Sequence, residues 1–228
     1  MVHRIKLEGF EYLHRWSCLY PDIVSAPGLV RSTQTKIGPK RRRNVTKFVC
    51  PSTYSEIVPS NLLISKIGPE SDLLLRNLYE HYIHDMAEWF EIDTRSDGSY
   101  SYDTSWIWEN GYDAYVAKVG GSIAGFALLG PAVEWLGVTA SHDMREFFVI
   151  RRFRRKGLGQ RMAIQFWNER PGNWLVRVLE SNTPAVLFWR SAISTYTVGV
   201  YADETRIVDG RRWLFFHFVS HASAELRP

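Results

Sequence analysis

The sequence has 228 residues, of which 45% are hydrophobic, and its formal net charge is +4. A chain of this length buries roughly 70% of its unfolded surface, so it can form one core without disulfides. Cys18 and Cys50 are too few for a disulfide framework or a zinc site. The longest uncharged apolar stretch, residues 123–133, is too short to span a membrane. These features predict a cytoplasmic protein with no membrane contact.

Positive charge is concentrated in the first 60 residues, which hold ten Lys or Arg against four Asp or Glu. The run Lys40-Arg41-Arg42-Arg43 is typical of a nucleic-acid or localisation patch. The alternative, which we favour, is a poorly ordered leader or a start codon assigned too far upstream, because prolines and serines interrupt the segment. We expect a basic N-terminal extension over 1–60, a folded domain over 61–221 and a tail over 222–228.

The folded domain is expected to begin with a strand and a helix. Residues 62–67 have strand character, and Pro69-Glu70 is a helix start. Apolar residues at helical spacing predict the buried face of this helix: Leu73, Leu74, Leu78, Tyr82, Met86 and Trp89.

Two further strands are expected at residues 112–119 and 122–129. They are separated by Gly120-Gly121, a dipeptide that supplies the positive φ angles of a tight hairpin. A buried strand over 144–150 then leads into the most informative segment of the chain.

That segment, residues 154–159, reads Arg-Arg-Lys-Gly-Leu-Gly and opens a stretch of helical periodicity. Two glycines let the backbone approach a ligand, and the first N–H groups of a helix lack internal acceptors, so the pattern predicts an anion cradle. A P-loop is excluded, because its Gly-Lys-Ser/Thr ending is absent. A dinucleotide fingerprint is excluded as well, because its third glycine would fall at Met162.

Downstream, residues 174–180 have strand character and are followed by Asn182-Thr183-Pro184-Ala185. Thr183 is the predicted N-cap of a helix, with Pro184 in its first position. One face of this helix is apolar, and residues 197–201 and 211–219 then read as a closing antiparallel pair of strands. The apolar face consists of Ala185, Phe188, Trp189, Ala192 and Ile193.

Arg-x-x-Gly-x-Gly followed by a strand and Asn-x-x-Ala resembles the signature of the GNAT superfamily of N-acetyltransferases. Glu146-Phe147-Phe148-Val149, Pro171-Gly172-Asn173-Trp174, Phe188-Trp189-Arg190 and residues 82–88 and 97–102 look like a branch of bacterial predicted acetyltransferases. The resemblance covers about residues 62–218. It implies an α/β (α+β) fold, with a mixed, mostly antiparallel sheet and helices on both faces, and acetyl-CoA as the cofactor. The cofactor-binding residues that it implies are Phe147, Phe148, Val149, Arg154, Arg155, Lys156, Gly157, Leu158, Gly159, Gln160, Asn182 and Phe188.

Acetyl transfer to an amine requires a base. An alkylammonium with a pKa near 10.4 is only about one part in 2,500 neutral at pH 7, so deprotonation costs close to 4.6 kcal/mol. Glu146 is the first candidate, Asp143 the second and His142 the third. Strand alternation would place Glu146 and Asp143 on opposite faces. The alternative role for Glu146 is an ion pair with a neighbouring Arg.

The acid that protonates the departing thiolate is harder to place. Many GNAT enzymes have a tyrosine seven residues after the asparagine, where this sequence has Trp189. Because an indole N–H is not a practical acid, water or a nearby phenol such as Tyr196 remains for this role.

The acceptor is expected near residues 85–113, which hold eight carboxylates against Arg95 alone, interleaved with aromatic residues. Carboxylates and aromatic faces favour a cation. The alternative is a solvated acidic loop with core aromatics. The predicted acceptor contacts are Asp85, Glu88, Trp89 and Tyr102.

Together these patterns predict an acetyl-CoA-dependent N-acetyltransferase that acts on a primary amine of a cationic small molecule or peptide. Two alternatives stay open: a tRNA- or protein-directed acetyltransferase guided by the basic extension, and a non-catalytic acetyl-CoA sensor. Nucleic-acid binding is not favoured, because an acidic acceptor segment repels a polyanion. No metal is expected, and the oligomeric state, a homodimer included, stays open.

Overall fold

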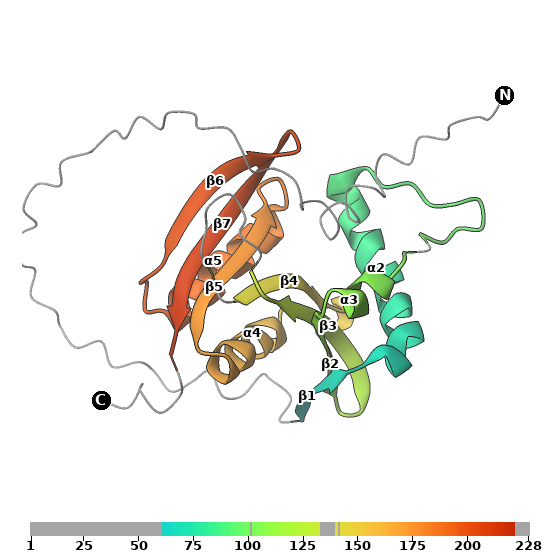
Figure 1. The fold of residues 1–228 in the computed structure, drawn as a ribbon, viewed down its shortest axis with the longest axis horizontal. Helices are drawn as coiled ribbons and strands as arrows, with labels where there is room; N and C mark the ends of the chain where they lie inside the picture. The colour runs from blue at the N-terminus through green and yellow to red at the C-terminus, as the bar shows by residue number, and fades with distance from the viewer. Residues whose placement is uncertain (1–60, 101, 133–139, 141, 222–228) are drawn as a thin grey trace, which may run out of the picture.

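Seven strands form one sheet in the order β1-β2-β3-β4-β5-β7-β6 (Figure 1). The computed structural model describes residues 61–100, 102–132, 140 and 142–221; the predicted basic extension and tail lie outside these residues. Every strand pair is antiparallel except β4–β5. The strands are β1 (Leu62–Ile67), β2 (Asp113–Val119), β3 (Ser122–Gly130), β4 (His142–Val149), β5 (Gly172–Leu179), β6 (Ala202–Val208) and β7 (Arg211–Ser220).

Helices cover both faces of this sheet, which confirms the predicted fold class (Figure 1). The α2–α3 core is the cluster in which α2 and α3 pack on one face, and the α4–α5 core is the cluster in which α4 and α5 pack on the other. No helix among the described residues is long and apolar enough to cross a membrane. The helices are α2 (Asp72–Phe90), α3 (Ser105–Glu109), α4 (Leu158–Glu169) and α5 (Thr183–Tyr196), with short 3-10 turns η1 (Pro69–Ser71) and η2 (Arg151–Phe153).

The predicted hairpin is confirmed between β2 and β3. Gly120 and Gly121 have φ angles of 55° and 81°, the left-handed conformations that a tight turn of this kind requires. The predicted closing pair of strands is also confirmed, as β6 and β7. The predicted bounds of its first strand, residues 197–201, are wrong. Residues 197–199 form a turn after α5, and the strand begins only at Ala202.

The helical phase of α2 differs from the prediction at one point. Leu73 is 71% exposed, whereas Leu75 is fully buried. Leu78 and Tyr82 are buried as predicted, and the remaining members of the predicted face pack partly buried against the α2–α3 core. The buried face of α2 is therefore centred on Leu75, which packs in the α2–α3 core with Tyr79 and Ile83.

The start of α5 is also corrected. Asn182 is the N-cap, because its side-chain Oδ1 accepts a hydrogen bond from the Ala185 backbone N–H at 3.1 Å. Thr183, the predicted cap, lies in the first turn and is exposed. The predicted apolar face of α5 is confirmed in the α4–α5 core.

Asn182→Ala should lower the free energy of unfolding by about 1 kcal/mol, because the substitution leaves the Ala185 N–H without its acceptor. Urea unfolding of the full chain measures this difference. Thr183→Ala is the matched control and should change the free energy much less. Equal losses in both variants would contradict the assignment of Asn182 as the cap.

Candidate active site

The parallel strands β4 and β5 separate after a short contact. Their pairing covers only His142–Met144 against Trp174–Val176, although β4 continues to Val149 and β5 to Leu179. A pocket lies where they separate. It is lined from α2 by Tyr82, Met86 and Phe90, from β4 by Met144, Arg145, Glu146 and Phe147, from β5 by Val176, Arg177, Val178 and Leu179, from the start of α5 by Asn182, Ala185 and Trp189, and from β7 by Trp213.

A β-bulge shapes the β4 side of this pocket. Leu128 of β3 pairs with Glu146 and Leu129 pairs with Met144, so Arg145 is the extra residue. The strand alternation expected from the sequence therefore fails here. Asp143 and Glu146 are not separated by the sheet. Met144 packs in the α4–α5 core, so its neighbour Asp143 faces the other side, where Glu146 meets Tyr82. The prediction that they serve opposite faces is wrong.

Glu146 is the carboxylate that reaches the pocket. The Tyr82 hydroxyl donates a hydrogen bond of 2.5 Å to it. Burial raises the pKa of the Glu146 carboxyl above its ordinary value of 4.5, while the nearby Arg145, the Tyr82 hydrogen bond and Arg177 act in the opposite direction. A carboxylate with a raised pKa is a stronger base than one in water.

The other candidates for proton transfer lie away from the pocket lining. Asp143 is 3% exposed and forms an ion pair with Arg177. A ring nitrogen of His142 lies 3.2 Å from the Pro171 carbonyl oxygen. The Tyr196 hydroxyl donates to Asn168 Oδ1 at 3.1 Å, at the far end of α5 and roughly 20 Å along the helix from Asn182.

The predicted anion cradle is formed at the start of α4. Gly157 is the N-cap, with a φ of 72°, and no side chain caps the helix. Its first N–H groups are therefore available to a ligand, with the positive end of the helix dipole behind them. A Cβ atom at Gly159 would lie 3.1 Å from the Phe188 ring, so a side chain at this position would require that ring to shift.

Two aromatic rings connect the cradle with the pocket. Phe147 and Phe188 are stacked with their centroids 5.9 Å apart, and Phe147 also contacts Trp189 at 5.0 Å. Phe148, by contrast, points to the other face, where it is 5% exposed and packs against Tyr82. Of the aromatic residues predicted to bind the cofactor, Phe147 and Phe188 lie at the cradle and the Phe148 side chain does not.

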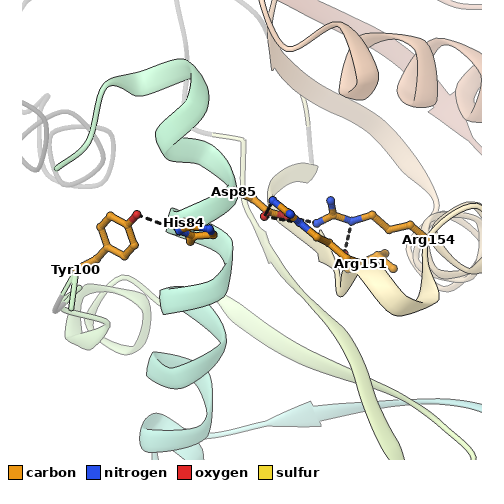
Figure 2. A network of polar contacts seen from close by, with 6 residues as sticks. His84, Asp85, Tyr100, Arg151 and Arg154 are labelled. Carbon is orange, nitrogen blue, oxygen red and sulfur yellow. Dashed lines mark hydrogen bonds and ion pairs between the residues drawn. The ribbon is translucent and has the colours of Figure 1, made fainter. Parts of the chain in front are cut away.

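Figure 2 shows how the cradle is tied to α2. Asp85 accepts hydrogen bonds from the Arg151 guanidinium at 2.6 and 3.0 Å, and it also forms an ion pair with Arg154. Arg154 Nε donates to the Val149 carbonyl at 2.6 Å. Partial burial alone would raise the pKa of Asp85, but the hydrogen bonds from the two arginines bring it below its ordinary value. Asp85, predicted to contact the acceptor, instead holds the turn before the cradle.

The aromatic residues of the acidic segment are mostly core residues. Tyr102 is 2% exposed and stacks on Tyr79 at 4.7 Å, which corrects its predicted contact with the acceptor. Glu88 is exposed and the Trp89 carbonyl accepts a hydrogen bond from Arg211, but neither residue lines the pocket. These positions support the alternative reading of an acidic loop with core aromatics.

Several carboxylates of the same segment are already engaged. Asp97 accepts hydrogen bonds from Ser99, and Asp103 accepts them from Ser105 at the start of α3. Asp113 pairs with Lys66 at 2.5 Å and with Arg170. With Asp85, four of the eight carboxylates of residues 85–113 are thus engaged in structural contacts.

The sequence did not indicate Arg145, Arg177 or Trp213 as pocket residues. No motif marks them, because β7 reaches the pocket only through sheet pairing and Arg145 only through the bulge. Tyr82 and Met86 were expected on the buried face of α2, and that position carried no sign of the Glu146 contact.

The family model described as the acetyltransferase (GNAT) family matches residues 79–192, which include the cradle, every pocket residue except Trp213, and α5 as far as Ala192. The chain belongs to the GNAT acetyltransferase family. It is therefore an acyltransferase of the N-acetyltransferase type that uses acetyl-CoA. No curated protein shows significant similarity to the sequence.

Solved structures share the fold at low sequence identity. A GNAT-family acetyltransferase from Streptococcus agalactiae is 18% identical, with a TM-score of 0.52 over 72% of this chain and 99% of that one. Spermidine N-acetyltransferase from Vibrio cholerae, solved with CoA and spermine, is 10% identical, with a TM-score of 0.50 over 71% of this chain and 96% of that one. The yncA protein of Salmonella typhimurium, solved with acetyl-CoA, is 15% identical, with a TM-score of 0.47 over 72% and 98%. At these identities the first two structures show the fold and leave the acceptor open.

The residues present fit the cofactor of the family. The uncapped start of α4 suits an anionic pyrophosphate, and Arg155 and Lys156 are exposed beside it. The start of α4 therefore fits a ligand with phosphates.

Asp85→Asn should lower the free energy of unfolding by about 1 kcal/mol at pH 7, because it removes a charge that two arginines bind. The folded pKa of Asp85 lies below its ordinary value of 3.8. Its contribution is therefore full above that value and is lost as the pH falls through the folded pKa. Urea unfolding at pH 7 and pH 3 should show a difference from the wild type that shrinks at the lower pH. The exposed Asp93→Asn is the control, and a pH-independent difference for Asp85→Asn would contradict the ion-pair role.

Gly157→Val should weaken the binding of coenzyme A roughly tenfold or more in calorimetry. A β-branched residue at a φ of 72° costs roughly 1–2 kcal/mol and disturbs the N–H groups of the cradle. Gly210→Val is the matched control, because Gly210 has a φ of 73° in the β6–β7 turn, away from the cradle. It carries the same strain and should keep the wild-type affinity. Unchanged affinity in Gly157→Val would show that the anion binds elsewhere.

Proposed function

We propose that this GNAT acetyltransferase moves an acetyl group to a primary amine, with Glu146 as the general base. The single observation that carries the proposal is the Glu146 carboxylate inside the pocket between the separated strands. Tyr82 donates a hydrogen bond to it, and burial raises its pKa. The acceptor arrives as an ammonium cation at neutral pH. Its positive charge would meet Glu146 in the pocket, whereas no carboxylate of residues 85–113 lines the pocket.

The cofactor would be held by residues of the cradle half. The N–H groups of Gly157, Leu158, Gly159 and Gln160 would bind its pyrophosphate, with Arg155 and Lys156 adding positive charge. Phe147, Phe188 and Asn182 would lie along its arm. When bound, acetyl-CoA supplies a thioester carbonyl as the electrophile.

The pocket supplies a base for the proton that the acceptor ammonium must lose. Glu146 accepts a proton from the ammonium, directly or through water, so that the neutral nitrogen forms a C–N bond with the acetyl carbon. The C–S bond breaks and the sulfur leaves as a thiolate, which takes up the second proton of the nitrogen. Because a free thiol titrates near pH 8.5, the thiolate is a tolerable leaving group without a dedicated acid. Trp189 contributes shape to the pocket and no proton.

Glu146→Gln should lower turnover roughly 100-fold or more, because an amide cannot take the proton of the acceptor. Affinity for acetyl-CoA should stay close to wild type. Thiol release from the full chain over a panel of amines measures the first quantity, and calorimetry measures the second. Because the pKa of Glu146 is raised, wild-type kcat/KM should fall with decreasing pH at a value above 4.5, and this acidic limb should disappear in the variant.

Glu169→Gln, an exposed carboxylate at the end of α4, is the matched control and should leave turnover unchanged. Unchanged turnover in Glu146→Gln would contradict the base assignment. Acetyl-CoA binding without thiol release across the whole panel would instead indicate a sensor.

A further inference from the structure

Arg145 is an arginine of the pocket that lies near carboxylates but has no hydrogen-bonded anion among the described residues. Its Nε is buried without a hydrogen-bond partner, and it makes no hydrogen bond or ion pair with any other residue that the structure describes. The second arginine of the pocket, Arg177, is neutralised by its ion pair with Asp143. Because an unpaired buried donor costs free energy, a ligand anion is the natural partner for Arg145.

The position of Arg145 separates this anion from those of the cofactor. The guanidinium carbon of Arg145 lies 5.6 Å from the centroid of the Trp106 ring, which belongs to the α2–α3 core. Arg145 is therefore on the α2–α3 side of the sheet. The cradle lies on the α4–α5 side, where Gly159 faces Phe147 and Phe188. An anion that reaches Arg145 therefore arrives with the acceptor.

The charge balance of the pocket points the same way. With Arg177 paired, the remaining charges are the Arg145 guanidinium and the Glu146 carboxylate, which interact electrostatically without a hydrogen bond between them. Once Glu146 has taken the proton of the acceptor, that compensation is lost. The other carboxylate that acts on Arg145 is Asp143, which is already paired with Arg177. An acceptor that carries its own anion supplies the balance.

We propose that the acceptor is an amino acid or a similar small amine with a carboxylate, which Arg145 binds while its amine faces Glu146. The inference rests on the proposed function. A planar guanidinium matches a carboxylate in bidentate geometry. The neighbouring walls formed by Met86, Phe90 and Trp213 suit an apolar side chain on such an acceptor.

The test measures the binding of acetylated products, so it requires no turnover. The products are compared in pairs that differ only in the carboxylate. The full chain, saturated with coenzyme A, is titrated in a calorimeter with N-acetylphenylalanine and N-acetylleucine, and with the matching N-acetylphenethylamine and N-acetylisoamylamine, which lack the carboxylate. The wild type should bind at least one carboxylate compound roughly tenfold more tightly than its partner. Arg145→Gln should abolish this preference, and Arg145→Lys should keep part of it. Arg76→Gln, an exposed arginine of α2, is the control and should keep all of it.

Several results would overturn the inference. They are equal binding within every pair, no binding of any carboxylate compound, or a preference that persists in Arg145→Gln. Far-UV circular dichroism checks the folding of that variant, and the wild-type pairs alone decide the matter should it misfold. Thiol release separates the two proposals. Turnover of amines with no preference for a carboxylate overturns this inference and leaves the proposed function intact. Carboxylate binding that depends on Arg145, with no turnover of any amine, supports the anion site and contradicts the proposed function.

Discussion

The brevity of the β4–β5 contact is the constraint on which the site depends. These two strands form the only parallel pair of the described sheet, and they stay together for three residue pairs. Beyond that point neither strand supplies the other with hydrogen-bond partners. The backbone N–H and C=O groups on the facing edges must therefore bind a ligand or water. The same separation brings the start of α5 and Trp213 of β7 to one pocket. A longer ladder would close the opening and leave the cradle without a reaction chamber beside it.

Helix α2 connects the two halves of this arrangement. Tyr82 and Asp85 are three residues apart, so they lie on the same side of the helix. Tyr82 holds the Glu146 carboxylate, and Asp85 holds the arginines of the turn that precedes α4. A shift of α2 would therefore disturb the base and the cradle together. The helix therefore links the position of the base to the position of the cradle.

Local patterns in the sequence predicted the features that depend on local chemistry. The β2–β3 hairpin follows from two glycines, and the start of α4 follows from glycines after a buried strand. The three consecutive leucines at 73–75 allow more than one helical phase, and only packing on the sheet selects Leu75. Asp85 contacts Arg151 and Arg154, which follow it by 66 and 69 positions in the sequence. No local spacing pattern predicts contacts at such separations. Asn182 and Thr183 are both good caps, so the sequence alone could not choose between them.

The bulge at Arg145 shows why the chemistry of the pocket was the least predictable part. In a regular strand, consecutive residues point to opposite faces, so Arg145 and Glu146 would be divided by the sheet. One extra residue breaks that rule and turns both toward the side of α2 and α3, where Arg145 lies over Trp106 and Glu146 meets Tyr82. A guanidinium next to a carboxylate lowers the pKa of the carboxyl, whereas burial raises it, so the bulge sets the strength of the base. A ligand anion that draws the positive charge of Arg145 away would raise the pKa of Glu146 further. The ammonium of the same acceptor lowers that pKa, so the anion at Arg145 would offset the cation at Glu146.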